Sequence, residues 1–485
     1  MRTLARTALF CLLLLQWSGV LHAQSQRDAV LELNVQVKAS TPTAQWLQSR
    51  AESPAPALLR DTHAAAHMRG CTEVKALAPA GKASTSTRRD PALSQIYTLR
   101  FPASTALAET PEALAQRLQA SGDFVWVEPN RSSSLHLAPA STPDDARIAE
   151  QWYHAKVETF AAWDTTRGSS SIVIGILDTG IDQYHPEFRG QLHINAAEDR
   201  NGNGTFEPWA DTTSIGGIPG DLDGLDQDGN GYADDVIGYD FTDQPRSPFG
   251  GDYLGPDPVP ADDNDHGTLV AGIVGARADN QYGGAGIAPG CRLMVIRAFS
   301  ANGSGEDDDI ARAILYAADN GVHVLNMSFG DIYPSQMMHA AIRYAHARGV
   351  VLIGSAGNGT GDQLHYPSGF EEVISVGASA LSFDGTTEIL WPLSSFGHTV
   401  SLVAPGSNIL CPIVLDSTRD ASFDFFSGTS CAAPMVSGAV GLLFSQRGVC
   451  SPEQVRGILC GSADDINAPG WDHYTGAGRL NIRRA

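Results

Sequence analysis

Residues 172–182 read IVIGILDTGID, an apolar run that ends at Asp178 and a Thr-Gly turn. Similar apolar runs recur at 293–299 (LMVIRAF), 322–329 (VHVLNMSF), 350–357 (VVLIGSAG) and 373–379 (VISVGAS), with helical stretches between them. Continuous apolar strands that alternate with helices predict an α/β fold, in which helices cover both faces of a mostly parallel sheet. Ligands bind beyond the carboxyl ends of such strands, so the chemistry should lie in the residues that follow each run.

Length and charge limit the kinds of protein that this chain can be. At 485 residues and 42% hydrophobic content, it is long enough for two or three folding units. Its net charge is −22, and the acidic excess lies from Asp144 onward, whereas the part before Asp144 is slightly basic. This charge argues against nucleic acid as a partner, because nucleic acid attracts basic proteins.

The first 23 residues are typical of a secretory signal peptide. Arg2 and Arg6 precede an apolar run at 8–15, and Leu21-His22-Ala23 has the small residues of a cleavage site. The run is well short of the roughly 20 residues that span a bilayer. We therefore expect a secreted protein, extracellular or periplasmic and of bacterial origin, with no membrane attachment once the signal is removed.

The segment between the signal and the predicted sheet contains one small module. Residues up to about 90 are rich in Ala, Pro, Ser and Thr and predict little regular structure. Alternation at 95–101 indicates a strand, 111–120 has the pattern of an amphipathic helix, and 124–127 indicates a second strand. The sequence predicts a small α+β module at about 92–130, and an unrelated small domain is the alternative.

Three motifs carry candidate catalytic side chains. Ser430 lies in FSGTSCAAP (426–434), where a turn leads into a small-residue helix whose N-terminus favours an oxyanion. His266 lies in NDHGTLVAGI (264–273) and is a base that could take the serine proton. Asp178 could orient that histidine. Taken singly, Ser430 could be a helix cap, His266 a packing histidine and Asp178 a turn former.

Together, in the order Asp178, His266, Ser430, these motifs resemble the subtilisin family of serine proteases. The resemblance covers about residues 144–482 and, more weakly, the preceding segment. It implies a three-layer subtilisin-like peptidase domain at 144–485, a secreted monomeric serine endopeptidase that hydrolyses polypeptides through an acyl-enzyme on Ser430. It also implies a zymogen, in which residues 24–143 form a propeptide whose module inhibits the enzyme until self-processing between about residues 131 and 145.

The resemblance also assigns the oxyanion hole and the substrate groove. Asn358 in IGSAGNG matches the asparagine that would donate its amide beside the Ser430 N–H, although it could instead be a left-handed turn residue or a glycosylation site. Ser328, Phe329 and Gly330 match the edge strand against which a peptide pairs, and Ser355, Ala356 and Gly357 match the opposite wall of the first pocket. Since Gly359 and His365 are expected near the pocket floor, we expect a preference for apolar or aromatic residues before the cleaved bond.

An acidic insertion at about 198–243 predicts calcium binding. It holds twelve acidic residues against one arginine, and DRNGNGTFE (199–207) and DQDGNGYADD (226–235) place oxygen ligands around glycine turns. A solvated acidic loop is the alternative. Glu187 and Asn280 match a structural calcium site of the family, which Asp144 or Asp145 could join. We expect calcium to be structural and catalysis to need no metal. The predicted ligands within the insertion are Asp199, Asn201, Asn203, Glu207, Asp226, Asp228, Asn230, Asp234 and Asp235.

Five of the seven cysteines follow residue 144, and the odd number leaves at least one thiol unpaired. Cys431, beside Ser430, is the best candidate for that thiol. A helix between Cys450 and Cys460 would hold them about 13 Å apart, too far for a disulfide. The pairing among Cys291, Cys411, Cys431, Cys450 and Cys460 is undecided from the sequence.

Three other functions are weighed against the protease. A catalytically inactive, calcium-stabilised binding protein would lack a triad residue, and none is missing. A nucleotide-binding α/β protein would carry a glycine fingerprint after its first strand, which this chain does not. An esterase or lipase would hold its serine in a Gly-x-Ser-x-Gly elbow, and Ser430 is not in one.

Overall fold

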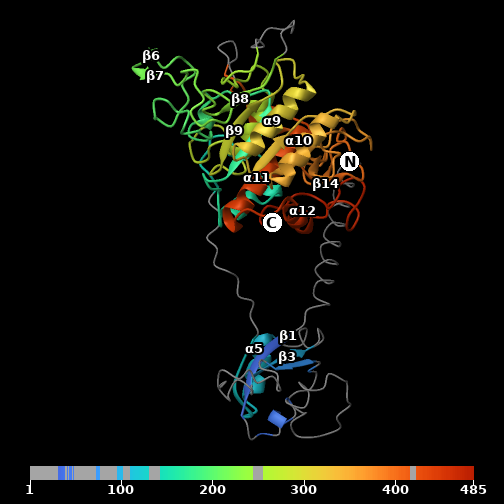
Figure 1. The fold of residues 1–485 in the computed structure, drawn as a ribbon. Helices are drawn as coiled ribbons and strands as arrows, with labels where there is room; N and C mark the ends of the chain where they lie inside the picture. The colour runs from blue at the N-terminus through green and yellow to red at the C-terminus, as the bar shows by residue number, and fades with distance from the viewer. Residues whose placement is uncertain are drawn as a thin grey trace, which may run out of the picture. The chain divides into compact units, whose positions relative to one another are not determined.

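A computed structural model describes residues 31–38, 41, 43–45, 47, 71, 73–76, 96–101, 110–129, 142–243, 255–415 and 422–485. The chain divides into two compact units, residues 1–136 and 137–485 (Figure 1). The predicted signal at 1–23 and most of the predicted processing interval lie outside the described residues. None of the helices in the described part is long and apolar enough to cross a bilayer.

The first unit is a four-stranded antiparallel sheet with one helix. The sheet has the order β2-β3-β1-β4 and comprises β1 (Leu31–Val37), β2 (Glu73–Ala76), β3 (Ile96–Phe101) and β4 (Phe124–Pro129). Helix α5 (Pro111–Gln119) packs on β4 and β1 and buries Leu114 and Leu118. Thr110 caps its N-terminus by accepting a hydrogen bond from the Ala113 N–H at 3.2 Å.

The structure corrects one expectation about this unit. The predicted strands and helix near 95–127 are present, but the expectation of little regular structure before residue 90 is wrong at β1 and β2. Strand β1 has the alternation LELNVQV and buries Val35 and Val37. It lies between β3 and β4, which follow it by about 60 and 90 residues. Its partners are therefore distant, and a short alternation in a segment of low complexity did not reveal them.

The second unit is built on the predicted sheet. The strand order is β13-β12-β11-β10-β5-β9-β8, with β14 also paired to β12. All pairs except β12 with β13 are parallel. The five apolar runs identified in the sequence overlap β5, β9, β10, β11 and β12. The strands of the sheet are β5 (Val173–Asp178), β8 (Gly238–Asp240), β9 (Arg292–Arg297), β10 (Val324–Met327), β11 (Val351–Ser355), β12 (Val373–Leu381), β13 (Glu388–Leu390) and β14 (Val400–Pro405).

Helices cover both faces of this sheet, as the sequence predicts. Helices α8 (His266–Gly275) and α11 (Thr429–Arg447) pack on one face, and α9 (Asp307–Asp319) and α10 (Gln336–Ala347) pack on the other (Figure 1). Successive residues of β5 serve the two layers in turn. Ile174 and Ile176 join the core under α8 and α11, whereas Leu177 joins the core under α9 and α10. The result is a three-layer α/β fold.

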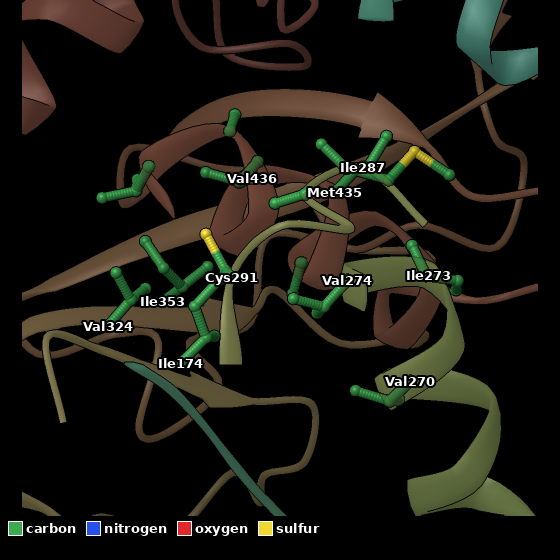
Figure 2. Close-up of a cluster of buried hydrophobic side chains, with 14 of the residues drawn as sticks. Ile174, Val270, Ile273, Val274, Ile287, Cys291, Val324, Ile353, Met435 and Val436 are labelled. Carbon is green, nitrogen blue, oxygen red and sulfur yellow. The ribbon is translucent and has the colours of Figure 1, made fainter. Parts of the chain in front are cut away.

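Figure 2 shows the core on the α8 and α11 side. Ile174, Val324 and Ile353, from three neighbouring strands, lie near Val274 of α8 and Val436 of α11, and all five are fully or almost fully buried. Side chains of this size contribute about 1.5–3 kcal/mol each when they leave water. The two helices whose first turns carry His266 and Ser430 are therefore anchored to the centre of the sheet.

Shorter elements complete the second unit. Strands β15 (Ile409–Pro412) and β16 (Phe423–Phe426) pair antiparallel, and so do β6 (Ser214–Ile215) and β7 (Ile218–Pro219). Helix α12 (Pro452–Ser462) begins with a capping box at Ser451. Cys291, Cys411, Cys431, Cys450 and Cys460 form no disulfide with one another. The remaining helical turns are η2 (Ile148–Glu150), α6 (Tyr153–Lys156), α7 (Thr159–Trp163) and η3 (Pro186–Phe188).

Candidate active site

Asp178 and His266 form a hydrogen-bonded pair. Asp178 is the last residue of β5 and is buried, and its Oδ1 accepts hydrogen bonds from the His266 Nδ1–H at 2.7 Å and from the Thr179 N–H at 2.8 Å. Burial lowers the pKa of His266, but the charge and the hydrogen bond of Asp178 outweigh burial and raise that pKa to about 9. The bond fixes the tautomer, so the other ring nitrogen is left to accept a proton.

Ser430 lies in the first turn of α11 and is linked to Ser328, the residue that follows β10. Pro434 is inside the helix and has no N–H to donate to the Ser430 carbonyl. The Ser328 hydroxyl donates to that carbonyl at 3.1 Å, and the Ser430 hydroxyl donates to the Ser328 carbonyl at 2.9 Å. A proline in the motif thus frees a carbonyl that locks the start of α11 to the edge of the sheet.

The candidate catalytic side chains meet in one pocket of about 310 Å³, which Asp178, His266, Asn358 and Ser430 all line. Within the described residues, Ser430 makes its side-chain hydrogen bond to Ser328 and makes none to His266. The hydroxyl must therefore turn from the Ser328 carbonyl toward the imidazole before a proton can pass. Such realignment is common, because catalytic hydrogen bonds often form fully only with substrate bound.

Asn358 follows β11 and faces the start of α11. Its Oδ1 accepts hydrogen bonds from the Thr429 N–H at 2.9 Å and the Thr429 hydroxyl at 3.0 Å, which leaves Nδ2 as the end that can donate to a ligand. A Cβ built on Gly428 would lie 3.5 Å from Asn358 Nδ2 and 3.6 Å from the Ser430 nitrogen. Two N–H donors therefore face the same small volume, as an oxyanion site requires.

The predicted substrate groove is brought together in the same pocket with one exception. Ser328, Phe329, Gly330, Ser355 and Gly357 line the pocket. Ala356 does not: it is 4% exposed and packs with Val400 and Val403. Ser355 ends β11, and successive side chains of a strand point in opposite directions, so Ala356 faces away from the pocket that Ser355 lines.

His365 occupies space between the two walls of the pocket. A Cβ on Gly330 would lie 2.5 Å from His365 Cε1, and a Cβ on Gly357 would lie 2.9 Å from His365 Cδ2. Both walls need glycine because the ring lies against their backbones. Gly359, expected near the floor, instead donates its N–H to the Ser395 hydroxyl at 3.0 Å and is not among the lining residues.

Other lining residues were not identified from the sequence. Thr179 and Thr429 flank Asp178 and Ser430, so their place in the motifs was an available signal. The others, from loops after β9 or before α8, are Asn264, Phe299 and Gly303. Only Asn264, within the His266 motif, and Phe299, at the end of an apolar run, had a sequence signal.

The two predicted calcium loops share one backbone geometry and are here called the twin loops, residues 199–207 and 226–235. The Asp199 carboxylate accepts hydrogen bonds from N–H groups three, four and five residues further on, at 2.8, 3.3 and 2.8 Å. The Asp226 carboxylate accepts the corresponding three at 2.7, 3.1 and 2.9 Å. Each aspartate therefore folds its loop around itself.

The second twin loop gathers more carboxylates than the first. Glu198, Asp228 and Asp235 each place a ligand atom within 4.8 Å of the other two, and Glu198 was not predicted as a ligand. The side chain of Asp234 turns away and accepts hydrogen bonds from the N–H groups of Asp223 and Gly224. In the first loop, Glu207 instead accepts hydrogen bonds from nearby polar side chains, namely Asn201, Asn203 and Thr205.

Glu187 and Asn280, predicted as a further calcium site, are in contact. Asn280 Nδ2 donates to Glu187 Oε2 at 2.9 Å, while Oε1 of this fully buried glutamate has no hydrogen-bond partner among the described residues. Burial raises the pKa of Glu187 to about 8. Asp145 accepts a hydrogen bond from the Asn280 N–H, and a second acidic group lies beside it, formed by Asp144, Asp145 and Asp279. A buried, unpartnered carboxylate oxygen fits a hard cation.

Known proteins are similar to this chain in both sequence and fold. Residues 169–478 match the model of the peptidase S8 subtilase family. A thermophilic serine proteinase of Bacillus sp. (strain AK1) is 32% identical over 375 residues, which are 77% of this chain and 75% of the relative. The halolysin-like extracellular serine protease Nep of Natrialba magadii is 30% identical over 80% of this chain, which spans 60% of that protein.

The fold agrees with a solved structure titled as proteases from Pseudoalteromonas arctica PAMC 21717. The match covers 71% of this chain and 98% of the chain in that structure, with a TM-score of 0.55 and 23% sequence identity. The family match spans most of the unit whose sheet carries the pocket. This chain belongs to the subtilase family and is a serine-type endopeptidase.

Proposed function

We propose that the chain is the precursor of a secreted, monomeric serine endopeptidase in which Asp178, His266 and Ser430 form the catalytic triad. The observation that carries this proposal is the 2.7 Å bond from His266 to Asp178 at a pocket that Ser430 also lines. The two pocket walls continue strands β10 and β11, and such walls suit polypeptide substrates that pair as an added strand.

In this mechanism each residue has one task. His266 takes the proton of the Ser430 hydroxyl as Oγ bonds to the peptide carbonyl carbon, and the carbonyl oxygen becomes an oxyanion between the Ser430 N–H and Asn358 Nδ2. When the C–N bond breaks, His266 returns the proton to the leaving amine. A water then repeats the sequence on the acyl-enzyme and releases the acid. Asp178 holds the imidazole and stabilises its charged form.

The domain roles form part of the same proposal. Residues 1–23 would be the signal peptide, and residues 24–143 the propeptide that inhibits the enzyme until it is cut. Residues 144–485 would be the peptidase domain. The small α+β unit within residues 1–136, separate from the unit that holds the pocket, supports this division. An extracellular relative supports export.

Calcium would be a structural ion of this enzyme, and catalysis would need no metal. The residues that would hold it are Glu187 with Asn280, and the carboxylates of the twin loops. When bound, the ion supplies charge compensation for buried carboxylates and ties loops to the folded state by binding linkage. Neither step of acyl transfer draws on it.

A preference for apolar or aromatic residues before the cleaved bond completes the proposal. Among the described residues, Asp178 is the one acidic residue that lines the pocket, and His266 already engages it. Cleavage mapping on a peptide library tests this, and cuts after mainly basic residues would contradict it.

Covalent labelling tests the triad directly. The purified precursor is incubated with a serine-directed fluorophosphonate and analysed by mass spectrometry, and we expect one label on Ser430 and a new N-terminus near Asp144. Ser430→Ala should take up no label and remain uncut. Ser427→Ala, three residues earlier, is the matched control and should behave like the unchanged protein. Labelling of Ser430→Ala, or its normal maturation in isolation, would contradict the proposal.

A further inference from the structure

Asp262 lies in the loop before α8, and both oxygens of its carboxylate accept hydrogen bonds. It is 7% exposed. Its Oδ1 accepts hydrogen bonds from the Thr179 hydroxyl at 2.8 Å and the N–H groups of Asn264 and Asp265 at 2.9 and 3.2 Å. Its Oδ2 accepts from the Thr268 N–H at 2.9 Å and hydroxyl at 2.6 Å. Five donors therefore converge on one buried carboxylate.

The two threonines belong to the segments that carry the candidate triad. Thr179 directly follows Asp178 and donates its N–H to that carboxylate at 2.8 Å. The Thr179 hydroxyl also accepts a hydrogen bond from the N–H of Gly267, the residue after His266, at 2.8 Å. Thr268 is in the first turn of the helix that His266 begins. Asp262 thus joins the end of β5 to the start of α8.

The loop that holds Asp262 is itself pinned. Asp265, directly before His266, has a φ of 87°, a conformation that costs a non-glycine residue on the order of 1–3 kcal/mol. Arg297, 1% exposed, donates to the Ala261 carbonyl at 3.0 Å and pairs with Asp263 at 3.2 Å. A buried cation therefore holds the backbone just before Asp262 and the side chain of the residue just after it.

The geometry points to Asp262 as a positioning residue for peptide hydrolysis, which holds His266 in register with Asp178 through Thr179 and Thr268. This inference rests on the proposed triad. A role limited to capping would need only the bonds to α8, because Asp265 at the N-cap position makes no side-chain cap. The bond to Thr179 reaches across to the strand of the other triad member, which a helix cap does not require.

The charge of Asp262 also acts on the imidazole. Burial raises the pKa of Asp262 to about 6, so the carboxylate is charged over the range in which His266 titrates. Asp178 and Asp262 both raise the pKa of His266, and Asp178 has the larger effect. The other charged groups of this region are Asp182, Asp240, Asp263, Asp265 and Arg297.

Asp262→Asn in the mature enzyme tests the inference, with active sites counted by fluorophosphonate titration. The amide keeps one acceptor but loses the charge and presents N–H groups to the donors. We expect kcat to fall about tenfold to a hundredfold with KM within threefold, since small misplacement of a catalytic group has effects of this size. The acidic limb of kcat/KM should move to lower pH by roughly half a unit, because a negative charge has been removed. A lower melting temperature with kcat and the limb unchanged would mean a purely structural role and overturn the inference.

Threonine variants decide the matter if Asp262→Asn does not fold or mature. Thr179→Ser and Thr268→Ser keep the hydroxyls, so kcat should be about tenfold higher in each of them than in Thr179→Val and Thr268→Val, respectively. Equal kcat in the Ser and Val variants would overturn the inference. Ser430→Ala separates the two proposals: if that variant still hydrolyses peptide, the triad has failed whatever Asp262 does.

Discussion

A single methyl group placed between the two proposed oxyanion donors should nearly abolish turnover without unfolding the enzyme. Gly428 has φ 165° and ψ 163°, an extended conformation that any residue adopts, so Gly428→Ala introduces no backbone strain. The new carbon would lie 3.5 Å from Asn358 Nδ2 and 3.6 Å from the Ser430 nitrogen, in ordinary van der Waals contact with both. The folded state tolerates that methyl.

The transition state of peptide hydrolysis does not tolerate this methyl group. An oxyanion must come within about 2.7–3.1 Å of both nitrogens. Non-bonded carbon and oxygen need roughly 3.5 Å, so an oxygen on the methyl's side of the donors would overlap it. If the overlap removes one donor, kcat falls by about 10²–10³, or about 2.7–4 kcal/mol, a range measured on the asparagine donor of a subtilisin itself. KM should change far less, because the donors act mainly on the transition state.

The assay is hydrolysis of a chromogenic peptide by mature enzyme, normalised to sites labelled by the fluorophosphonate. Gly359→Ala is the matched control, because its methyl meets only the Ser395 hydroxyl, at 3.5 Å, although it directly follows Asn358. That variant should keep kcat within about threefold. An unchanged melting temperature for both variants would show that the fold is intact. If Gly428→Ala retained kcat within threefold, the oxyanion would not lie between these donors.

Three further outcomes follow from the same structure. Neutral imidazole is the active base and the pKa of His266 is raised to about 9, so kcat/KM should rise with pH through about 9. The stability contributed by the ion pair of Asp178 with charged His266 is complete below pH 6.5 and is lost as the pH rises through about 9. Arg297→Met should reduce the free energy of unfolding by about 3–5 kcal/mol in urea titrations, since it leaves Asp240 buried without its cation, and Arg297→Met with Asp240→Asn should recover part of the loss. A chelator should lower the melting temperature, and the free energy of unfolding should fall by about 2.7 kcal/mol if calcium is present at a hundred times its Kd. Asp226→Ala should remove more of this calcium dependence than Asp199→Ala, because the second twin loop gathers more carboxylates. Equal effects of the two variants would contradict the second twin loop as the stronger calcium site.

The sequence predicted the second unit well, and the reason is physical. Strands buried on both faces are mostly apolar, so β5 and β11 stand out as runs whose only polar residue is the last one, and β10 is interrupted only by the buried Asn326. Their carboxyl ends meet at one edge, where the chemistry was expected, and the resemblance to the subtilisin family then assigned roles to Asp178, Ser328 and Asn358, which follow or end these runs. Burial made the pattern visible in the chain.

What the sequence could not supply depends on contacts between distant segments. Whether Ala356 faces the pocket depends on the direction of one extended residue, and its neighbours share its small, uncharged character. Glu198 contributes to the second twin loop although it precedes the first, because the fold brings its carboxylate to the N–H groups of Gln227 and Asp228. The strand β1 pairs with segments about 60 and 90 residues away. In the sequence Asp262 does not stand out among many acidic residues, because its donors after β5 and in α8 converge only in the fold.

The glycines of the two motifs show how closely the segments of Asp178 and His266 must approach. A Cβ on Gly267 would lie 2.0 Å from the Gly180 carbonyl oxygen. A Cβ on Gly180 would lie 2.7 Å from the Ala261 carbonyl oxygen, which accepts the hydrogen bond from Arg297. The turn after Asp178, the start of α8 and the loop before it therefore touch backbone to backbone. Side chains cannot be the spacers there, so the distance between carboxylate and imidazole is set by main-chain contact. Hydrogen bonds along that contact can then keep the two groups in register.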